Sequence, residues 1–230
     1  KPGPVAKLLP SAHAIEREFT VMSGLYGTDV PVPRMHCLCE DEAVIGRAFY
    51  VMEFMQGRVL WDQSLPGMTP QERGAIYTEM NRVISALHTV KFADRGLATY
   101  GKPGNYFKRQ LERWSEQWRQ WRRGDDDNPA LDWVTAWLAE RAPESELITL
   151  CHGDLRIGNM MFDDSFEVVT VMDWEQPSLG GALCDLGYWI AVSEVMHGDR
   201  PGRPGQRHAG ADLALAEVDG LAYRHRHPRR

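Results

Sequence analysis

The most informative part of the chain is Leu150-Cys-His-Gly-Asp-Leu-Arg-Ile-Gly-Asn-Met-Met-Phe162, followed by Val168-Val-Thr-Val-Met-Asp-Trp-Glu175. Short apolar, β-rich runs alternate there with polar segments, which is typical of strands that end in loops. We expect these loops to bring Asp154, Asn159 and Asp173 within reach of one point. Such a set suits phosphoryl transfer. One carboxylate can accept the proton of an attacking hydroxyl, while the amide and the second carboxylate hold Mg²⁺ on nucleotide phosphates.

A simpler interpretation is a pair of hairpin turns, because Asp, Asn and Gly are common in loops. Each of the three residues, taken alone, favours that interpretation. The complete ordered set, with strands between its members, favours catalysis.

The order His-Gly-Asp-Leu-x-x-x-Asn followed by Asp-Trp-Glu resembles the aminoglycoside phosphotransferase family of kinase-like enzymes. Over about residues 5 to 197 the chain is similar to one branch of that family, the kinase domains of acyl-CoA dehydrogenase family members 10 and 11. The closer resemblance rests on Lys7–Ala14, Phe49–Phe54, Gly57-Arg58, Trp61-Asp62, Tyr100–Phe107 and Trp174-Glu175.

The resemblance implies an ATP-dependent transfer of phosphate to a hydroxyl of a small molecule. Asp154 would be the catalytic base, and Asn159 and Asp173 the Mg²⁺ ligands. His152 would brace the loop, and Arg156 would neutralise phosphate or orient the substrate. The branch suggests a hydroxyacyl-CoA or a hydroxy acid as acceptor.

The nucleotide side of the predicted site begins on a helix that Ser11 can cap, with an apolar face that runs to Leu25. By resemblance, Glu18 on this helix pairs with a nucleotide-binding lysine, although a solvated helix carboxylate fits the spacing as well. The apolar strand Ala48–Phe54 resembles the hinge between kinase lobes, where backbone groups of Glu53, Phe54 and Met55 bind adenine. A stretch rich in Met and aromatic residues is also typical of plain core.

Other elements follow from periodicity and capping signals. Thr69 starts a helix that ends at His88, a residue we expect to pack or cap. Asn105–Trp121 is predicted as a helix whose aromatic stripe mostly packs, with part of it lining an acceptor site. The Tyr100–Tyr106 loop is expected to be a structural turn in preference to a substrate contact. The remaining predicted elements are the strand Met35–Cys39 and the helices Asp132–Arg141 and Gly180–Val195, the last with Asp185 bracing the catalytic loop by resemblance.

These predictions define an α+β, protein-kinase-like two-lobed fold with a truncated N-terminal β lobe and a mainly helical C-terminal lobe. We expect the partial N-lobe at 1–56, the C-lobe at 57–197 and an atypical, disordered tail at 198–230. The family's phosphate-covering loop would precede this chain, and Lys1 and Lys7 are the available lysines ahead of Glu18. An alternative is therefore a truncated, catalytically inactive kinase-like protein that binds a nucleotide or a partner.

Composition narrows the class of protein further. The chain has 230 residues, 43% of them hydrophobic, with a net charge of -6, which argues against a nucleic-acid partner. No apolar run approaches the length of a membrane span and no signal peptide opens the chain, so we expect a soluble cytoplasmic protein. Its four cysteines show no Cys-x-x-Cys pair, and three of them lie in apolar settings, so we expect buried, reduced thiols in preference to a disulfide framework. The sequence does not indicate an oligomeric state.

Overall fold

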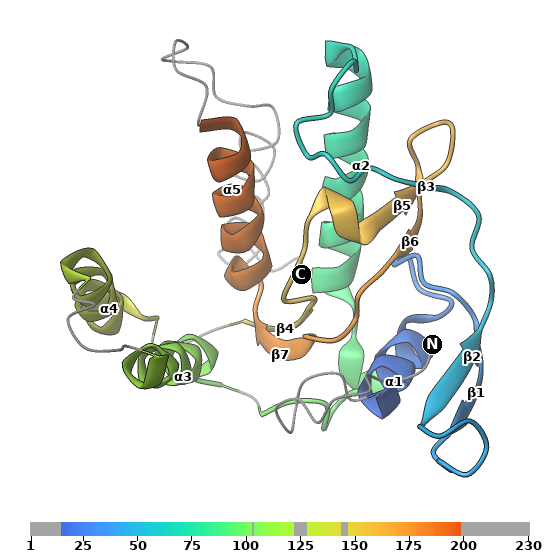
Figure 1. Ribbon diagram of the computed structural model, residues 1–230, viewed down its shortest axis with the longest axis horizontal. Helices are drawn as coiled ribbons and strands as arrows, with labels where there is room; N and C mark the ends of the chain where they lie inside the picture. Colours follow the sequence, from blue (N-terminus) through green and yellow to red (C-terminus); the bar gives the residue numbers. More distant parts are fainter. Residues whose placement is uncertain (1–14, 103, 122–127, 144–146, 199–230) are drawn as a thin grey trace, which may run out of the picture.

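The computed structural model describes residues 15–102, 104–121, 128–143 and 147–198. Helices α2 (Pro70–Thr89) and α5 (Leu183–Gly198) run side by side through the middle (Figure 1). Helix α1 (Ile15–Leu25) and two short strands lie on one side of them, and α3 (Tyr106–Trp121) and α4 (Pro129–Arg141) lie on the other. The mixture of helices and small antiparallel sheets confirms the predicted α+β class.

The small N-terminal part consists of α1 packed on an antiparallel pair, β1 (Met35–Cys39) and β2 (Phe49–Met52). Val21 and Leu25 of α1 are completely buried, as the apolar periodicity predicts. The predicted cap at Ser11 and the two lysines Lys1 and Lys7 lie outside the described residues.

Helix α2 forms the centre of the core and begins where the sequence predicts. The Thr69 hydroxyl accepts a hydrogen bond from the Glu72 amide at 3.3 Å, and the Glu72 carboxylate accepts one from the Thr69 amide at 2.7 Å. One face of the helix is buried at 0–1% exposure through Ile76, Met80, Val83, Ile84 and Leu87.

The functional loops are carried by two small sheets. Strands β3 (Arg58–Val59), β5 (Met160–Phe162) and β6 (Val168–Val171) pair in that order, and β4 (Ile148–Cys151) pairs with β7 (Ser178–Gly181). Short 3₁₀ turns complete the framework at Phe92–Arg95 and Ile157–Asn159.

The predicted helix start at Gly180 is wrong, because this residue belongs to β7 and pairs with Thr149. A Cβ at Gly180 would lie 2.7 Å from the Tyr106 ring, so the glycine permits a close approach of sheet and helix. Helical periodicity alone does not reveal such a contact with a distant residue.

Helices α3 and α4 form a pair of their own. Among the α3 side chains that the structure describes, Tyr106 alone is buried. Every described residue of α4 is at least partly exposed. Helix α4 begins before the predicted Asp132, since Asn128 caps it by accepting a hydrogen bond from the Leu131 amide at 3.1 Å. In the apolar stripe of α3, Phe107, Leu111 and Trp118 are half-buried, whereas Trp114 is 53% exposed and departs from the expected packing.

All four cysteines are free thiols, but the expectation that they are buried holds for Cys151 alone. Cys37 is exposed, because the β1–β2 pair has an open face, and Cys39 and Cys184 are half-buried. No helix in the described part of the chain combines the length and apolar character needed to cross a bilayer. Residues 199–230, for which we expect disorder, lie outside the described part.

Candidate active site

The His-Gly-Asp loop (residues 152–159) is fastened to the Asp173 loop (residues 172–177) by its histidine. The Asp154 amide donates to His152 Nδ1 at 3.2 Å, which leaves Nε2 as the protonated nitrogen, 2.8 Å from the Met172 carbonyl oxygen. Gly153 has a φ of +87°, and a Cβ there would lie 2.6 Å from the Gln176 carbonyl oxygen. Only glycine fits this close approach.

Asp185 on α5 supports the first residues of the same loop. Its carboxylate accepts hydrogen bonds from the backbone amides of His152 and Gly153, both at 2.8 Å, and lies 3.0 Å from His88 Nε2. Burial opposes ionisation of Asp185, yet the contact with His88 and these amides hold its pKa below the ordinary value. The role expected of Asp185 is thus present in the geometry.

The Asp154 carboxylate is held from several sides. The Asn159 amide nitrogen donates to its Oδ2 at 2.8 Å and to the Asp154 carbonyl oxygen, also at 2.8 Å. Arg156 Nε lies 3.4 Å from the same carboxylate, and Tyr188 of α5 hydrogen-bonds it. Burial raises the pKa of Asp154, but Tyr188, Asn159 and Arg156 outweigh it and set the pKa below the ordinary range. The side chain is 17% exposed, so it is ionised and still reachable by a ligand.

The residues expected to hold Mg²⁺ present suitable donors. The amide nitrogen of Asn159 is engaged with Asp154, so its oxygen is the group left for a cation. The backbone amide of Met172 donates to the backbone carbonyl oxygen of Asn159 at 2.8 Å, which connects Asn159 to the segment that leads to Asp173. Asp173 is half-buried with a φ of +63°. Carboxylate and amide oxygens are the ligands that a hard cation prefers, so the donor set fits Mg²⁺.

Glu18 faces this site from α1. It is 2% exposed and accepts a hydrogen bond from the Tyr50 hydroxyl at 2.8 Å, so the alternative of a solvated helix carboxylate is wrong. Burial, followed by the charges of Glu18 and Asp173, raises the pKa of Tyr50. Helix α1, strand β2 and the Asp173 loop therefore converge at Tyr50. The pairing of Glu18 with a lysine stays a prediction.

The predicted hinge follows β2 as an irregular segment. The Glu53 amide donates to the Arg34 carbonyl oxygen at 2.8 Å, whereas no backbone hydrogen bond between described residues uses Met55. Phe54 is 85% exposed, which contradicts the alternative that this stretch is plain core. Adenine binding by these residues stays a prediction.

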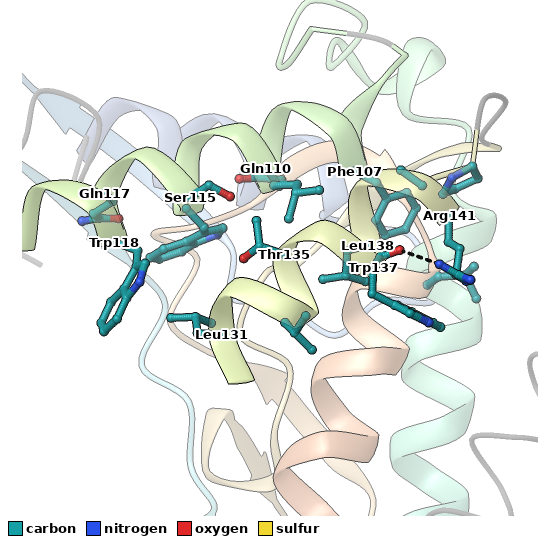
Figure 2. A pocket seen from close by; sticks show the side chains of 16 residues that line it. Phe107, Gln110, Ser115, Gln117, Trp118, Leu131, Thr135, Trp137, Leu138 and Arg141 are labelled. Atoms are coloured by element: carbon teal, nitrogen blue, oxygen red, sulfur yellow. Dashed lines mark hydrogen bonds between the residues drawn. The ribbon is translucent and has the colours of Figure 1, made fainter. Parts of the chain in front are cut away.

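An apolar cavity of about 620 Å³ opens between α3 and α4 (Figure 2). Trp114 and Trp118 line it from α3, and Leu138 and Arg141 from α4. Leu183, the first residue of α5, also lines it, and Tyr188 follows five residues later on the same helix. Five residues correspond to a rise of about 7.5 Å along α5 and a rotation of about 140°, so Leu183 and Tyr188 lie on different faces of the helix.

Tyr188 and His88 are the site residues that the sequence analysis missed or underrated. Tyr188 lies three residues after Asp185, and residues at this spacing share one face of a helix. That spacing was a usable signal. The contact of His88 with Asp185 joins helices 97 positions apart, and no local pattern reveals it.

Comparison with known proteins identifies the family to which the chain belongs. The family model of the phosphotransferase enzyme family matches residues 5–225. The chain belongs to this family. Acyl-CoA dehydrogenase family member 10 of Mus musculus is 42% identical over 186 residues, which are 80% of this chain and 17% of that protein. Member 11 of Homo sapiens is 37% identical over 188 residues, 81% of this chain and 24% of that protein. This phosphotransferase chain thus spans less than a quarter of the length of these relatives.

Solved structures of phosphotransferases have the same fold. A Ralstonia eutropha protein assigned to the aminoglycoside phosphotransferases is 43% identical with a TM-score of 0.72, over 90% of this chain and 72% of that chain. The streptomycin–ATP ternary complex of APH(2″)-IIa, at 14% identity, has a TM-score of 0.59 over 93% and 67% of the two chains, a likeness of fold alone. These matches confirm the expected kinase-like α+β fold.

Proposed function

We propose that this chain transfers the γ-phosphate of ATP to a hydroxyl of a small molecule, and that the acceptor carries an acyl chain, as in a hydroxy acid or a hydroxyacyl-CoA. The observation that carries the proposal is the Asp154 carboxylate. Asn159, Arg156 and Tyr188 hold it ionised and partly exposed, next to the residue proposed as the first magnesium ligand, Asn159.

Asp154 would orient the acceptor hydroxyl and take its proton as the new oxygen–phosphorus bond forms. Its lowered pKa keeps it ionised at neutral pH, and the hydrogen bond from Asn159 fixes the direction of its free lone pairs. Mg²⁺ held by Asn159 and Asp173 would neutralise charge on the transferring phosphate. Arg156, half-buried beside Asp154, is placed to add a fixed positive charge.

The nucleotide would enter from the side of β2 and α1. Backbone groups at Glu53, Phe54 and Met55 would bind adenine, and buried Glu18 would orient a lysine against the phosphates. A distant neighbour with the same fold forms a complex with ATP, which supports a nucleotide as the phosphate donor.

The open cavity supports an acyl acceptor. Its walls are mainly aromatic and aliphatic, and burying an apolar chain there would contribute roughly 0.8 kcal/mol per methylene. The relatives that share this region are acyl-CoA dehydrogenase family members by name. A polar aminoglycoside would find few hydrogen-bond partners among these side chains, whereas an acyl chain is complementary to them.

The test combines the purified chain with Mg·ATP and hydroxy acids or hydroxyacyl-CoA thioesters of increasing chain length, and follows the phosphorylated product by ³¹P NMR. We expect a phosphate ester whose rate of formation rises with chain length. Trp114→Ala, which opens the cavity wall, should raise the acceptor KM about tenfold, in line with the loss of roughly one aromatic contact.

Trp133→Ala is the matched control, since Trp133 is 63% exposed on α4 and does not line the cavity. Mg·ATP binding without product from any acceptor would instead favour the inactive, nucleotide-binding alternative. Equal rates for all chain lengths would remove the acyl chain from the proposal and leave the phosphotransfer intact.

A further inference from the structure

The Arg17 side chain on α1 joins three segments that are distant in the sequence. Its Nη1 donates to the Tyr100 carbonyl oxygen at 3.2 Å, and its Nη2 to the Pro177 carbonyl oxygen at 3.4 Å. Its guanidinium carbon lies 4.2 Å from the centre of the Tyr100 ring. The Tyr100 hydroxyl donates back to the Arg17 carbonyl oxygen at 3.2 Å. We call this arrangement of Arg17, Tyr100 and Pro177 the Arg17 clamp.

The side of the clamp that Tyr100 forms is closely packed. Tyr100 is 7% exposed, and burial raises its pKa to about 12, so its hydroxyl remains a donor at every working pH. A Cβ at the neighbouring Gly101 would lie 3.0 Å from the Leu179 amide nitrogen, which shows how closely this loop approaches β7. Helix α1 is therefore attached to a closely packed surface.

The residues of the clamp are close in sequence to two residues of the proposed nucleotide site, Glu18 and Asp173. Arg17 immediately precedes Glu18, and Pro177 ends the loop that begins just before Asp173. Arginine suits this position because its planar fork can donate to two carbonyl groups while its face stacks on a ring. A lysine has one charged nitrogen and cannot make all three contacts.

We infer that Arg17 is a positioning residue, which fixes α1 against the Tyr100 loop and the Asp173 loop and thereby sets Glu18 relative to Asp173. Its effect on nucleotide binding rests on the proposed function, whereas the clamp itself does not. Tyr100, the first residue of the loop expected from sequence to be a structural turn, has Arg17 as its partner.

Hydrogen exchange of the full chain without ligand tests the clamp directly. In Arg17→Ala, amides of α1 and of residues 173–178 should exchange about tenfold faster, while those of α2 stay unchanged, because the opening is local. Tyr100→Phe, which loses one hydrogen bond and keeps the stacked ring, should show about a threefold effect. Glu16→Ala is the control, as Glu16 is exposed on the same helix.

Unchanged exchange of α1 in folded Arg17→Ala would overturn the inference. If that variant fails to fold, Arg17→Lys replaces it, with accelerated exchange of α1 expected and wild-type exchange overturning the clamp. In a second readout, the Kd for Mg·ATP should rise about tenfold in Arg17→Ala, because the competent position of α1 is less populated. If wild type itself binds no nucleotide, the proposed function fails while hydrogen exchange still decides the clamp.

Discussion

The His-Gly-Asp loop and the α3–α4 pair differ in how their side chains are held. In the loop, His152, Asp154 and Asn159 are joined to one another, and His152 also to Met172 and Asp185, by hydrogen bonds of 2.8–3.2 Å. In the α3–α4 pair, large side chains line an open apolar cavity, and two of the pair's five tryptophans, Trp114 and Trp133, are more than half exposed. Under the proposed function, the hydrogen-bonded loop would be the fixed centre of the chemistry and the open cavity the surface that receives the acceptor.

Replacing Asp154 by Ala should cause the largest loss of activity. We expect turnover to fall by about 10²–10⁴-fold, the usual contribution of a general base, while the Kd for Mg·ATP changes little. Steady-state and single-turnover rates measure the effect. Asp164→Ala is the matched control, because this exposed aspartate lies in the turn after β5. A variant with wild-type turnover would remove Asp154 from the chemistry.

Asp185→Ala should produce the largest loss of stability. It leaves two backbone amides and His88 without their buried acceptor, a change that costs about 3–5 kcal/mol. Urea denaturation gives the free energy of unfolding. Asp132→Ala, on the exposed face of α4, is expected to stay within about 0.5 kcal/mol of wild type. A mild effect at Asp185 would mean that the loop is held mainly by other contacts.

Sequence analysis could single out Asp154, Asn159 and Asp173 as candidates because their order along the chain is itself the signal. Asp154 and Asp173 follow the strands β4 and β6, Asn159 directly precedes β5, and the structure links their loops through Met172. The misses have a common cause. The Gly180 helix start and the packing of Trp114 both depend on what lies opposite in space, which one strand or helix does not reveal.

Two substitutions by alanine, one in the buried core and one beside the cavity, sharpen the contrast in packing. Ile84→Ala in α2 empties a fully buried position and should cost about 2–5 kcal/mol. Trp114→Ala in α3 should cost less than about 1 kcal/mol, since the ring is half exposed and its neighbours already border a cavity. The free energies of unfolding of the two variants are compared under identical conditions. Similar costs at both positions would contradict an open acceptor surface.

The smallest expected effect is the acid sensitivity of the loop. The folded-state pKa of Asp154 and of Asp185 lies below the ordinary 3.8, so their stabilisation is complete above that value and is lost as pH falls through the lowered pKa. The free energy of unfolding should therefore decline below about pH 4 in wild type and decline less steeply in Asp185→Asn. Parallel pH dependence in the two proteins would show that Asp185 does not contribute to this decline.

Titration calorimetry of Mg·ATP into wild type and Asp173→Asn tests the central claim most directly. The substitution removes one negative charge while nearly preserving shape, and hard cations depend on carboxylate charge. We predict that wild type binds ATP more tightly with Mg²⁺ than with a chelator. In Asp173→Asn this Mg²⁺ dependence should disappear, with an unchanged or slightly raised melting temperature of the ligand-free protein. Wild-type Mg²⁺ dependence in Asp173→Asn would contradict the assignment of Asp173 as a metal ligand.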